Sequence, residues 1–208
     1  MIKLLSVAKT FKRHFYNFFK WESHCFREFG YKSNIRNPRC SITNKKSIEI
    51  GDYTYIDKFA RIDPVIRWNQ QRFTPLIKIG SKVLINQNFH CTCAESIIIG
   101  DRTAITANCS VFDIIHPYEN IQLSPATSDI IVDPVKIGND CIIGMNSVIM
   151  PGTVLGIHCV VGANSVVKGI FPDYSVIVGS PAKIIKRYNP KVGKWEKTNP
   201  DGSFFKSY

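Results

Sequence analysis

The stretch that decides the fold runs from Ile137 to Pro172 and repeats itself every six residues. Its units are Ile-Gly-Asn-Asp-Cys-Ile, Ile-Gly-Met-Asn-Ser-Val, Ile-Met-Pro-Gly-Thr-Val, Leu-Gly-Ile-His-Cys-Val and Val-Gly-Ala-Asn-Ser-Val. Each unit opens with an aliphatic residue, and a small residue follows four positions later: Cys141, Ser147, Thr153, Cys159 and Ser165. A period of six fits neither an α-helix nor an ordinary strand. It is typical of a parallel β-helix, in which each unit forms one short strand and one turn.

The same frame extends towards the N-terminus and breaks at two places. Three units make one coil of a β-helix, and the openers recur in threes: Ile50, Ile56 and Ile62; Ile79, Ile85 and Cys91; Ile99, Ile105 and Val111. The frame slips by two residues between Cys91 and Ile99, and it is lost at residues 63–76 and 117–134. Both breaks are polar and contain aromatic residues and proline, which predicts loops that leave the stack. Loops on a rigid scaffold are where binding and catalytic residues concentrate.

We therefore predict an all-β protein built around a parallel β-helix. The sequence divides into a basic, helical N-terminal extension (1–46), the β-helix domain with its two loops (47–180), and a short C-terminal helix with a tail (181–208). The length of 208 residues fits one domain with extensions.

The expected C-terminal helix rests on local signals. Ser180 is a favourable N-cap, and Pro181 is favourable at the first helical position. On such a helix Lys183, Lys186 and Arg187 share one face.

The first twenty residues are apolar and basic, and two interpretations of them stay open. The apolar side chains fall at helical spacing with lysine and arginine between them: Leu4, Ala8, Phe11, Phe15 and Phe18. Such a helix can cover the open end of a β-helix. It can also lie on an anionic membrane surface, which gives a peripheral membrane contact through residues 1–20. The segment lacks the uninterrupted apolar core of a signal peptide, and no stretch of the chain is apolar for long enough to predict a transmembrane helix.

The formal net charge is +11 at pH 7, with the basic residues concentrated at the two ends of the chain. The repeat between them is close to neutral, and no zinc-finger or aromatic RNA-binding motif is present. We therefore expect no nucleic-acid partner. The charge favours an anionic small molecule or a membrane surface.

The seven cysteines are an odd number, which argues against a complete disulfide framework. Several occupy the small inward position of a repeat, where they act as small apolar side chains. The run His90-Cys91-Thr92-Cys93 has no second pair at zinc-finger spacing, so we expect no metal site. Free thiols without an export signal predict a cytoplasmic protein, with the inner face of the membrane as a peripheral location.

The repeat, the two breaks and one histidine together resemble a known family. The chain resembles the hexapeptide-repeat acyltransferases, in the branch of maltose, galactoside and polysaccharide O-acetyltransferases, roughly over residues 47–188. The resemblance is carried by Ile85-Asn86-Gln87-Asn88, Phe112-Asp113-Ile114-Ile115-His116-Pro117, Val135-Lys136-Ile137-Gly138-Asn139-Asp140, Pro151-Gly152-Thr153-Val154, Val161-Gly162-Ala163-Asn164-Ser165-Val166-Val167 and Gly179-Ser180-Pro181-Ala182-Lys183. It implies a left-handed β-helix, a hand that spacing alone does not reveal.

The resemblance also implies a homotrimer whose active sites lie between neighbouring chains, with acetyl-CoA as acyl donor in the groove between two subunits. It implies that His116 is the general base and that Asn86 contacts the substrate at the same site. The resemblance also makes Cys93 a candidate substrate contact, because it stands where related sugar acetyltransferases often have an aspartate. The residues implied for CoA binding are Gly144, Ala163, Lys168, Lys183, Lys186 and Arg187, of which the last three would meet the CoA phosphates.

The chemistry is consistent with a histidine base. Acetyl transfer from a thioester to a hydroxyl needs a group that takes the hydroxyl proton, and a neutral imidazole is suited to that role. His116 lies where the strand frame ends and the second loop begins. We expect Asp113 to orient the ring or to bind an acceptor hydroxyl, and His90 to line the acceptor pocket.

The predicted function is therefore acetyl transfer from acetyl-CoA to a hydroxyl of a sugar or glycan acceptor, in surface polysaccharide biosynthesis. An alternative within enzymes is N-acylation of an amino sugar or an antibiotic. An alternative from another class is a metalloprotein resembling γ-carbonic anhydrase. That function requires His90, His116 and His158 to converge, which their spacing does not favour.

Overall fold

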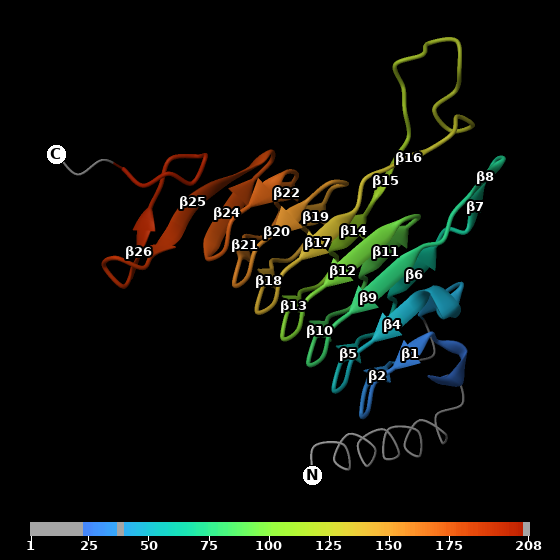
Figure 1. Ribbon diagram of the computed structural model, residues 1–208, viewed down its shortest axis with the longest axis horizontal. Helices are drawn as coiled ribbons and strands as arrows, with labels where there is room; N and C mark the ends of the chain where they lie inside the picture. Colours follow the sequence, from blue (N-terminus) through green and yellow to red (C-terminus); the bar gives the residue numbers. More distant parts are fainter. Residues whose placement is uncertain (1–22, 37–39, 206–208) are drawn as a thin grey trace.

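The computed structural model describes residues 23–36 and 40–205. They form a left-handed parallel β-helix, a three-sided prism whose coils stack from the N-terminal to the C-terminal end (Figure 1). The predicted fold class is confirmed by three sheets of short parallel strands. The predicted amphipathic segment, residues 1–20, lies outside the described residues.

Each face of the prism is one sheet. Face A consists of β1 (Glu28–Phe29), β4 (Ile48–Ile50), β9 (Leu76–Ile79), β12 (Ser96–Ile99), β17 (Val135–Ile137), β20 (Val154–Leu155) and β23 (Ile170–Phe171). Face B consists of β2 (Asn34–Ile35), β5 (Tyr55–Ile56), β10 (Leu84–Ile85), β13 (Ala104–Ile105), β18 (Ile142–Ile143), β21 (Val160–Val161) and β24 (Ser175–Gly179), and it continues into two antiparallel strands. Face C consists of β3 (Ser41–Ile42), β6 (Arg61–Pro64), β11 (His90–Cys93), β14 (Ser110–Phe112), β19 (Val148–Ile149) and β22 (Val166–Val167).

The core follows directly from the six-residue frame. The openers of successive coils pair in register, as Ile85 does with Ile105 and Ile105 with Ile143 on face B. These three side chains are fully buried. Because side chains alternate along a strand, the neighbouring residue points outwards, and Ile142 is accordingly 49% exposed. The interior is therefore a column of aliphatic layers, one set of three openers per coil.

The chain turns sharply at three edges, which we call AB, BC and CA after the faces they join. Most corners hold one residue in the left-handed region, where asparagine and glycine are the best tolerated residues. On the BC edge these residues include Asn88, Asn108, Asn146 and Asn164. Their side-chain amides donate in series to the next asparagine at 2.8, 3.0 and 3.0 Å, so the edge carries a continuous ladder of hydrogen bonds.

The small residue of each unit fills the inside of a corner. On the AB edge Thr103 donates to the carbonyl of Gly138 at 2.9 Å, and the thiol of Cys141 donates to that of Gly156 at 3.2 Å. Each bond joins one coil to the next. A side chain on Gly138 would come within 2.5 Å of the Gly156 carbonyl oxygen, so only glycine fits there.

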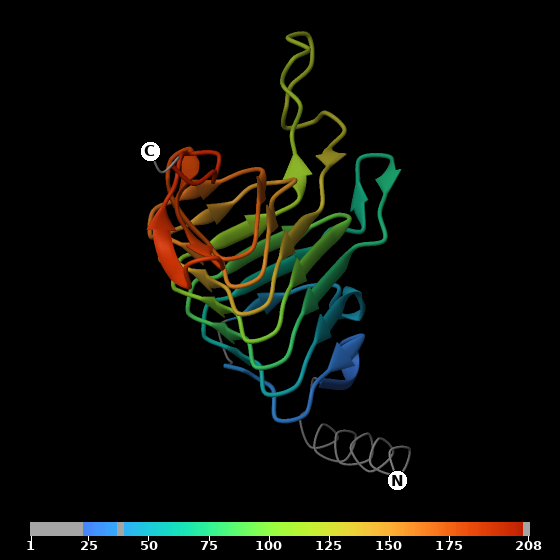
Figure 2. The same ribbon diagram turned by 60° about the vertical axis from the view of Figure 1, so that its left-hand side comes forward.

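Two excursions leave the prism at the CA edge, where the sequence frame breaks. The first contains the hairpin of β7 (Arg67–Trp68) and β8 (Gln71–Arg72). The second rises through β15 (Ile114–Ile115) and returns through β16 (Ile131–Val132), which pair antiparallel. Both project on the same side of the prism, as the two views agree (Figures 1 and 2).

The prism begins earlier than the predicted boundary at residue 47. β1, β2 and β3 pair in parallel with β4, β5 and β6, so these three strands already contribute one strand to each face. The expected helical extension is wrong for the described residues below 47, whose only helical elements are the short 3-10 turns η1 (Ser23–Cys25) and η2 (Lys45–Ser47). Phe29 is the opener of the first unit in this segment. Because it is not Ile, Leu or Val, the six-residue frame is not recognisable there from the sequence. In the part of the chain that the structure describes, no helix has the length and apolarity needed to cross a membrane.

The expected C-terminal helix is also wrong. Residues Ala182–Asn189 form strand β25, which pairs antiparallel with β24 and with β26 (Lys194–Lys197). Strand pairing outweighs the local capping signals, because the backbone groups of β24, the last parallel strand of face B, form hydrogen bonds with β25. Ile184 also packs opposite Ile177 in the core. The tail therefore extends face B and is part of the folded domain.

Candidate active site

His116 stands directly after β15, at the foot of the second excursion. Its backbone is held by the ribbon that β15 makes with β16, in which Ile115 pairs with Ile131. Its side chain is exposed. The structure thus presents an accessible imidazole on a paired ribbon, at the position where the sequence predicts the general base.

The nearest aromatic neighbour of His116 comes from the first excursion. The indole of Trp68 lies with its ring centroid 5.3 Å from that of the imidazole, at an interplanar angle of 74°. Sequence reasoning missed Trp68. The only signal for it was an aromatic residue inside the first break of the frame, and nothing in the sequence pairs that break with the second.

Asp113 does not reach His116 as predicted. Its carboxylate is fully buried and accepts hydrogen bonds from the backbone N–H groups of Ala94, Glu95 and Ser96 at 2.8, 2.8 and 2.9 Å. These residues form the corner where the frame slips by two positions, so their N–H groups lie outside the regular ladder. Asp113 replaces the missing ladder bonds, and its structural role explains why it is buried rather than facing an acceptor.

Cys93 is also wrongly predicted as a substrate contact. Its side chain is fully buried, and its thiol lies 3.3 Å from Oδ2 of Asp113. Burial, and then the negative charge of Asp113, raise the pKa of the Cys93 thiol far above its usual range. The residue remains a neutral thiol that donates to the buried carboxylate.

The remaining predicted acceptor residues border face C. His90 begins β11 with an exposed side chain, and its Nε2 lies 3.1 Å from Oγ1 of Thr92. Asn86 follows β10 at the BC edge. His116 lies beyond the opposite, CA edge of the same face. Face C therefore separates Asn86 from His116 within one chain.

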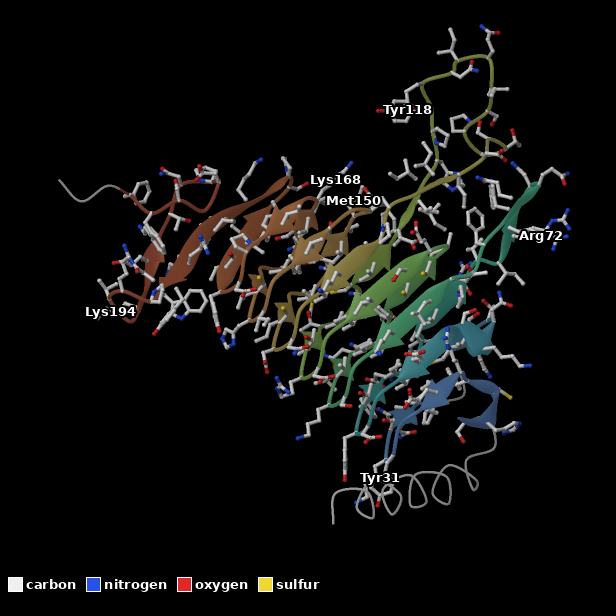
Figure 3. The ribbon with its side chains drawn as sticks, viewed as in Figure 1. Tyr31, Arg72, Tyr118, Met150, Lys168 and Lys194 are labelled. Atoms are coloured by element: carbon white, nitrogen blue, oxygen red, sulfur yellow. The ribbon has the colours of Figure 1, made fainter. Side chains whose placement is uncertain are left out.

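The predicted CoA residues fall into three places. Gly144 and Ala163 are stacked at the BC edge, where a side chain on Gly144 would meet the Ala163 nitrogen at 2.5 Å. Lys183 lies opposite Val178, at the BC end of β25. Lys168 is at the CA edge, on the side of the prism from which the second excursion rises (Figure 3).

The other two cations lie near the AB end of β25, and they diverge. Lys186 and Arg187 pair with Val176 and Ser175 of β24. Lys186 is exposed, whereas Arg187 donates from Nη1 to the carbonyl of Gly202 at 3.3 Å and lies over the Phe204 ring. The expected single face of three cations is therefore wrong, because successive strand residues point to opposite sides. Arg187 ties down the tail.

Metal ligands do not assemble in the described chain. His90 lies on face C, His116 beyond the CA edge and His158 on the AB edge. Among residues 23–36 and 40–205 there is no group of three histidine, cysteine, aspartate or glutamate residues placed to hold a metal ion.

Comparison with known proteins agrees with the fold. The family profile described as hexapeptide repeat of succinyl-transferase matches residues 134–168. Over 170 residues the chain is 35% identical to WbbJ of Escherichia coli strain K12, which carries the name of a lipopolysaccharide biosynthesis O-acetyl transferase; the match spans 78% of this chain and 83% of WbbJ. The chain belongs to the hexapeptide-repeat acyltransferase family. It is therefore an acyltransferase.

Other relatives are similar over less of their length or in fold alone. A protein of Mycobacterium tuberculosis named as an acetyltransferase is 36% identical over 110 residues, which cover 53% of this chain and 37% of that protein. AntD, an N-acyltransferase from Bacillus cereus solved with dTDP and 3-hydroxybutyryl-CoA, has a TM-score of 0.70 at 24% identity, covering 83% of this chain and 89% of AntD. A hexapeptide-repeat acetyltransferase from Vibrio cholerae, solved with acetyl-CoA, has a TM-score of 0.54 at 25% identity, covering 80% and 73%.

The role of Asp113 predicts a loss of stability on substitution. In Asp113→Asn an amide NH2 replaces one acceptor and faces backbone donors, so the buried charge and at least one hydrogen bond are lost. We expect the free energy of unfolding to fall by about 2–4 kcal/mol in denaturant titration. Asp133→Asn, an exposed carboxylate on the same ribbon, is the control and should change it by less than about 0.5 kcal/mol. An Asp113→Asn protein as stable as the wild type but inactive would restore the ring-orienting role.

Proposed function

We propose that this acyltransferase moves the acetyl group of acetyl-CoA to a hydroxyl of a sugar, in the biosynthesis of a surface polysaccharide, with His116 as general base. The observation that carries the proposal is the position of His116. It is an exposed imidazole on a rigid ribbon, at the foot of the two excursions, in a chain related to WbbJ over most of its length.

The proposed reaction is a direct transfer. His116 takes the proton of the acceptor hydroxyl as the hydroxyl oxygen attacks the thioester carbonyl carbon. Backbone N–H groups at a prism edge supply hydrogen bonds to the oxyanion of the tetrahedral intermediate. The carbon–sulfur bond then breaks, and the proton held by His116 passes to the sulfur of CoA. No acyl group is attached to the protein at any step.

Acetyl-CoA is the donor that the residues at the BC edge and on strand β25 fit best. Ala163 is a small, exposed residue at that edge, and Gly144 packs closely against its backbone nitrogen. Lys183 and Lys186, both exposed, provide cations for phosphates. The Vibrio cholerae relative binds acetyl-CoA on the same fold.

A second candidate is acylation of an amino group, which the likeness in fold to AntD favours. The same base serves both reactions. A panel of neutral sugars, nucleotide sugars and amino sugars, assayed by release of the CoA thiol, separates the two: the O-acetyltransferase proposal requires turnover with acceptors that have only hydroxyl groups.

We also propose that the protein is a homotrimer with shared sites. In one chain, face C separates the residues of the BC edge from His116. A symmetric ring in which the BC edge of each chain meets the CA edge of the next unites them at every interface.

Replacing His116 with Ala should lower the rate of acetyl transfer by about 10²- to 10⁴-fold, because the hydroxyl attacks without a base. Acetyl-CoA binding, measured by calorimetry, should stay normal, since His116 acts on the acceptor hydroxyl and the proposed contacts to CoA are made by other residues. His158→Ala, an exposed histidine on the AB edge, is the control and should keep the wild-type rate. A His116→Ala rate above about a tenth of wild type would reject His116 as the base.

Shared sites predict complementation between two inactive variants. His116→Ala lacks the base, and Ala163→Trp fills the exposed BC edge. Co-expressed with different affinity tags, they should form mixed trimers in which one interface of three has both a working base and an open edge. Such trimers, purified by both tags, should show about a third of the wild-type rate. Mixed trimers as inactive as the parents would place the whole site in one chain, and sedimentation as a monomer would remove the trimer itself.

Lys183→Ala and Lys186→Ala should each raise the KM for acetyl-CoA by about tenfold at low salt, because each removes a charge-assisted hydrogen bond to phosphate. The difference from wild type should shrink in high salt. Lys136→Ala, an exposed lysine on face A, is the control. Arg187→Ala should loosen the tail and lower the unfolding temperature with little effect on this KM. An unchanged KM in both lysine variants would show that these cations do not bind the donor.

A further inference from the structure

The contact between Trp68 and His116 joins two excursions that are far apart in the sequence. Trp68 ends β7, at the turn of the hairpin, and His116 follows β15. Their rings meet at a centroid distance of 5.3 Å and an angle of 74°. In this perpendicular arrangement the edge of one ring faces the π-system of the other, a favourable geometry that also restricts rotation of the smaller ring.

The indole is itself held in place. Its Nε1 donates to the carbonyl of Ser128 at 2.8 Å, in the returning limb of the second excursion. Trp68 therefore contacts that excursion twice, at its foot through His116 and on its return through Ser128. The hydrogen bond fixes the plane of the indole, and the ring face or edge remains available to the imidazole.

The hairpin is clasped to the same limb by two further residues. Gln71, which pairs with Trp68 across the hairpin, donates to the carbonyl of Ile130 at 3.0 Å and accepts from its N–H at 2.8 Å. Asn69 at the turn donates to the carbonyl of Thr127 at 2.7 Å. These hydrogen bonds join the two excursions and hold the Trp68 indole beside the His116 imidazole.

His116 has no other restraint of this kind. Within the described ranges, 23–36 and 40–205, its ring nitrogens have no hydrogen-bond partner. Asp113, three residues earlier in the sequence, accepts hydrogen bonds with both carboxylate oxygens from the corner at residues 94–96. Many catalytic histidines are oriented by a carboxylate that bonds one ring nitrogen. Among residues 23–36 and 40–205 no carboxylate bonds the ring in this way, and the His116 side chain is exposed.

We propose that Trp68 is the positioning residue of His116, and that an aromatic contact orients the base where other enzymes use a carboxylate. The inference rests on the proposed function of His116. Trp68 sets the rotamer of the imidazole, so that one nitrogen faces the acceptor hydroxyl. The second nitrogen stays accessible to solvent.

The test compares an aromatic and an aliphatic replacement of similar bulk. Trp68→Leu fills space but has no ring, and we expect kcat to fall by about 10- to 100-fold with an unchanged KM for acetyl-CoA, because misorientation of a base acts on the transition state. Trp68→Phe keeps a ring but loses the indole N–H, and it should keep kcat within about threefold. Gln71→Ala loosens the clasp without removing the ring, and its loss should be smaller than that of Trp68→Leu.

A spectroscopic measurement separates orientation from a general loss of structure. An aromatic ring at this distance shifts the NMR signals of the imidazole protons of His116, which are identified by their absence in His116→Ala. The shift should disappear in Trp68→Leu and persist in Trp68→Phe and Gln71→Ala. Unfolding temperatures of the three variants establish that the fold is retained. If Trp68→Leu is unstable, Trp68→Phe is compared with the wild type instead.

The outcomes distinguish this inference from the proposed function. If His116→Ala is inactive but Trp68→Leu keeps kcat within about threefold, His116 remains the base and the positioning role of Trp68 is overturned. If Trp68→Phe loses as much activity as Trp68→Leu, the hydrogen bond to Ser128 matters and the ring does not. If His116→Ala is active, the base itself is wrongly assigned, which the first experiment reveals before any change at Trp68.

Discussion

Every coil of the prism must place its backbone N–H groups beside the carbonyl groups of the coil next to it, and the rest of the structure depends on that register. The bonds run from coil to coil at close to constant length, as from Ala104 to Cys141 at 2.8 Å and from Ile142 to Cys159 at 2.9 Å. Since the spacing of parallel strands is fixed, a residue can be added only where the chain leaves the ladder. Insertions are therefore confined to the edges, and both excursions occur at the same one.

The same constraint explains the buried carboxylate of Asp113. The frame slips by two residues at the corner of Ala94–Ser96, and without Asp113 three N–H groups there, one buried and two partly buried, would lose their acceptor. An unpaired buried donor costs about 1–3 kcal/mol, so three would threaten a domain of ordinary stability. One carboxylate accepts all three bonds. The corner it holds lies beneath the ribbon that carries His116, which links the repair of the fold to the geometry of the site.

A solenoid of this kind also spreads its functional groups. Each edge is a straight column, so residues on different edges of one chain are held apart by the width of a face. His116 lies beyond the CA edge, whereas Gly144 and Ala163 lie at the BC edge. In the proposed trimer one edge meets another by symmetry, and the excursions can then vary with the acceptor while the proposed donor site stays on the prism.

The sequence by itself determined the prism, because its signal is local: six residues encode one strand and one turn, and the pattern repeats often enough to be seen. The two excursions and the place of His116 followed from the points at which the pattern stops. Only the tertiary structure decided the rest. Residues 182–189 follow the capping signals of a helix, Ser180 and Pro181, but form a strand, since the last strand of face B has unpaired backbone groups that a helix cannot satisfy. The side chains of Asp113 and Cys93 are buried because Asp113 accepts hydrogen bonds from the Cys93 thiol and the Ala94 N–H, which belong to the preceding coil. Trp68 reached His116 because the stacking of coils sets two distant breaks side by side, a proximity that no local pattern encodes.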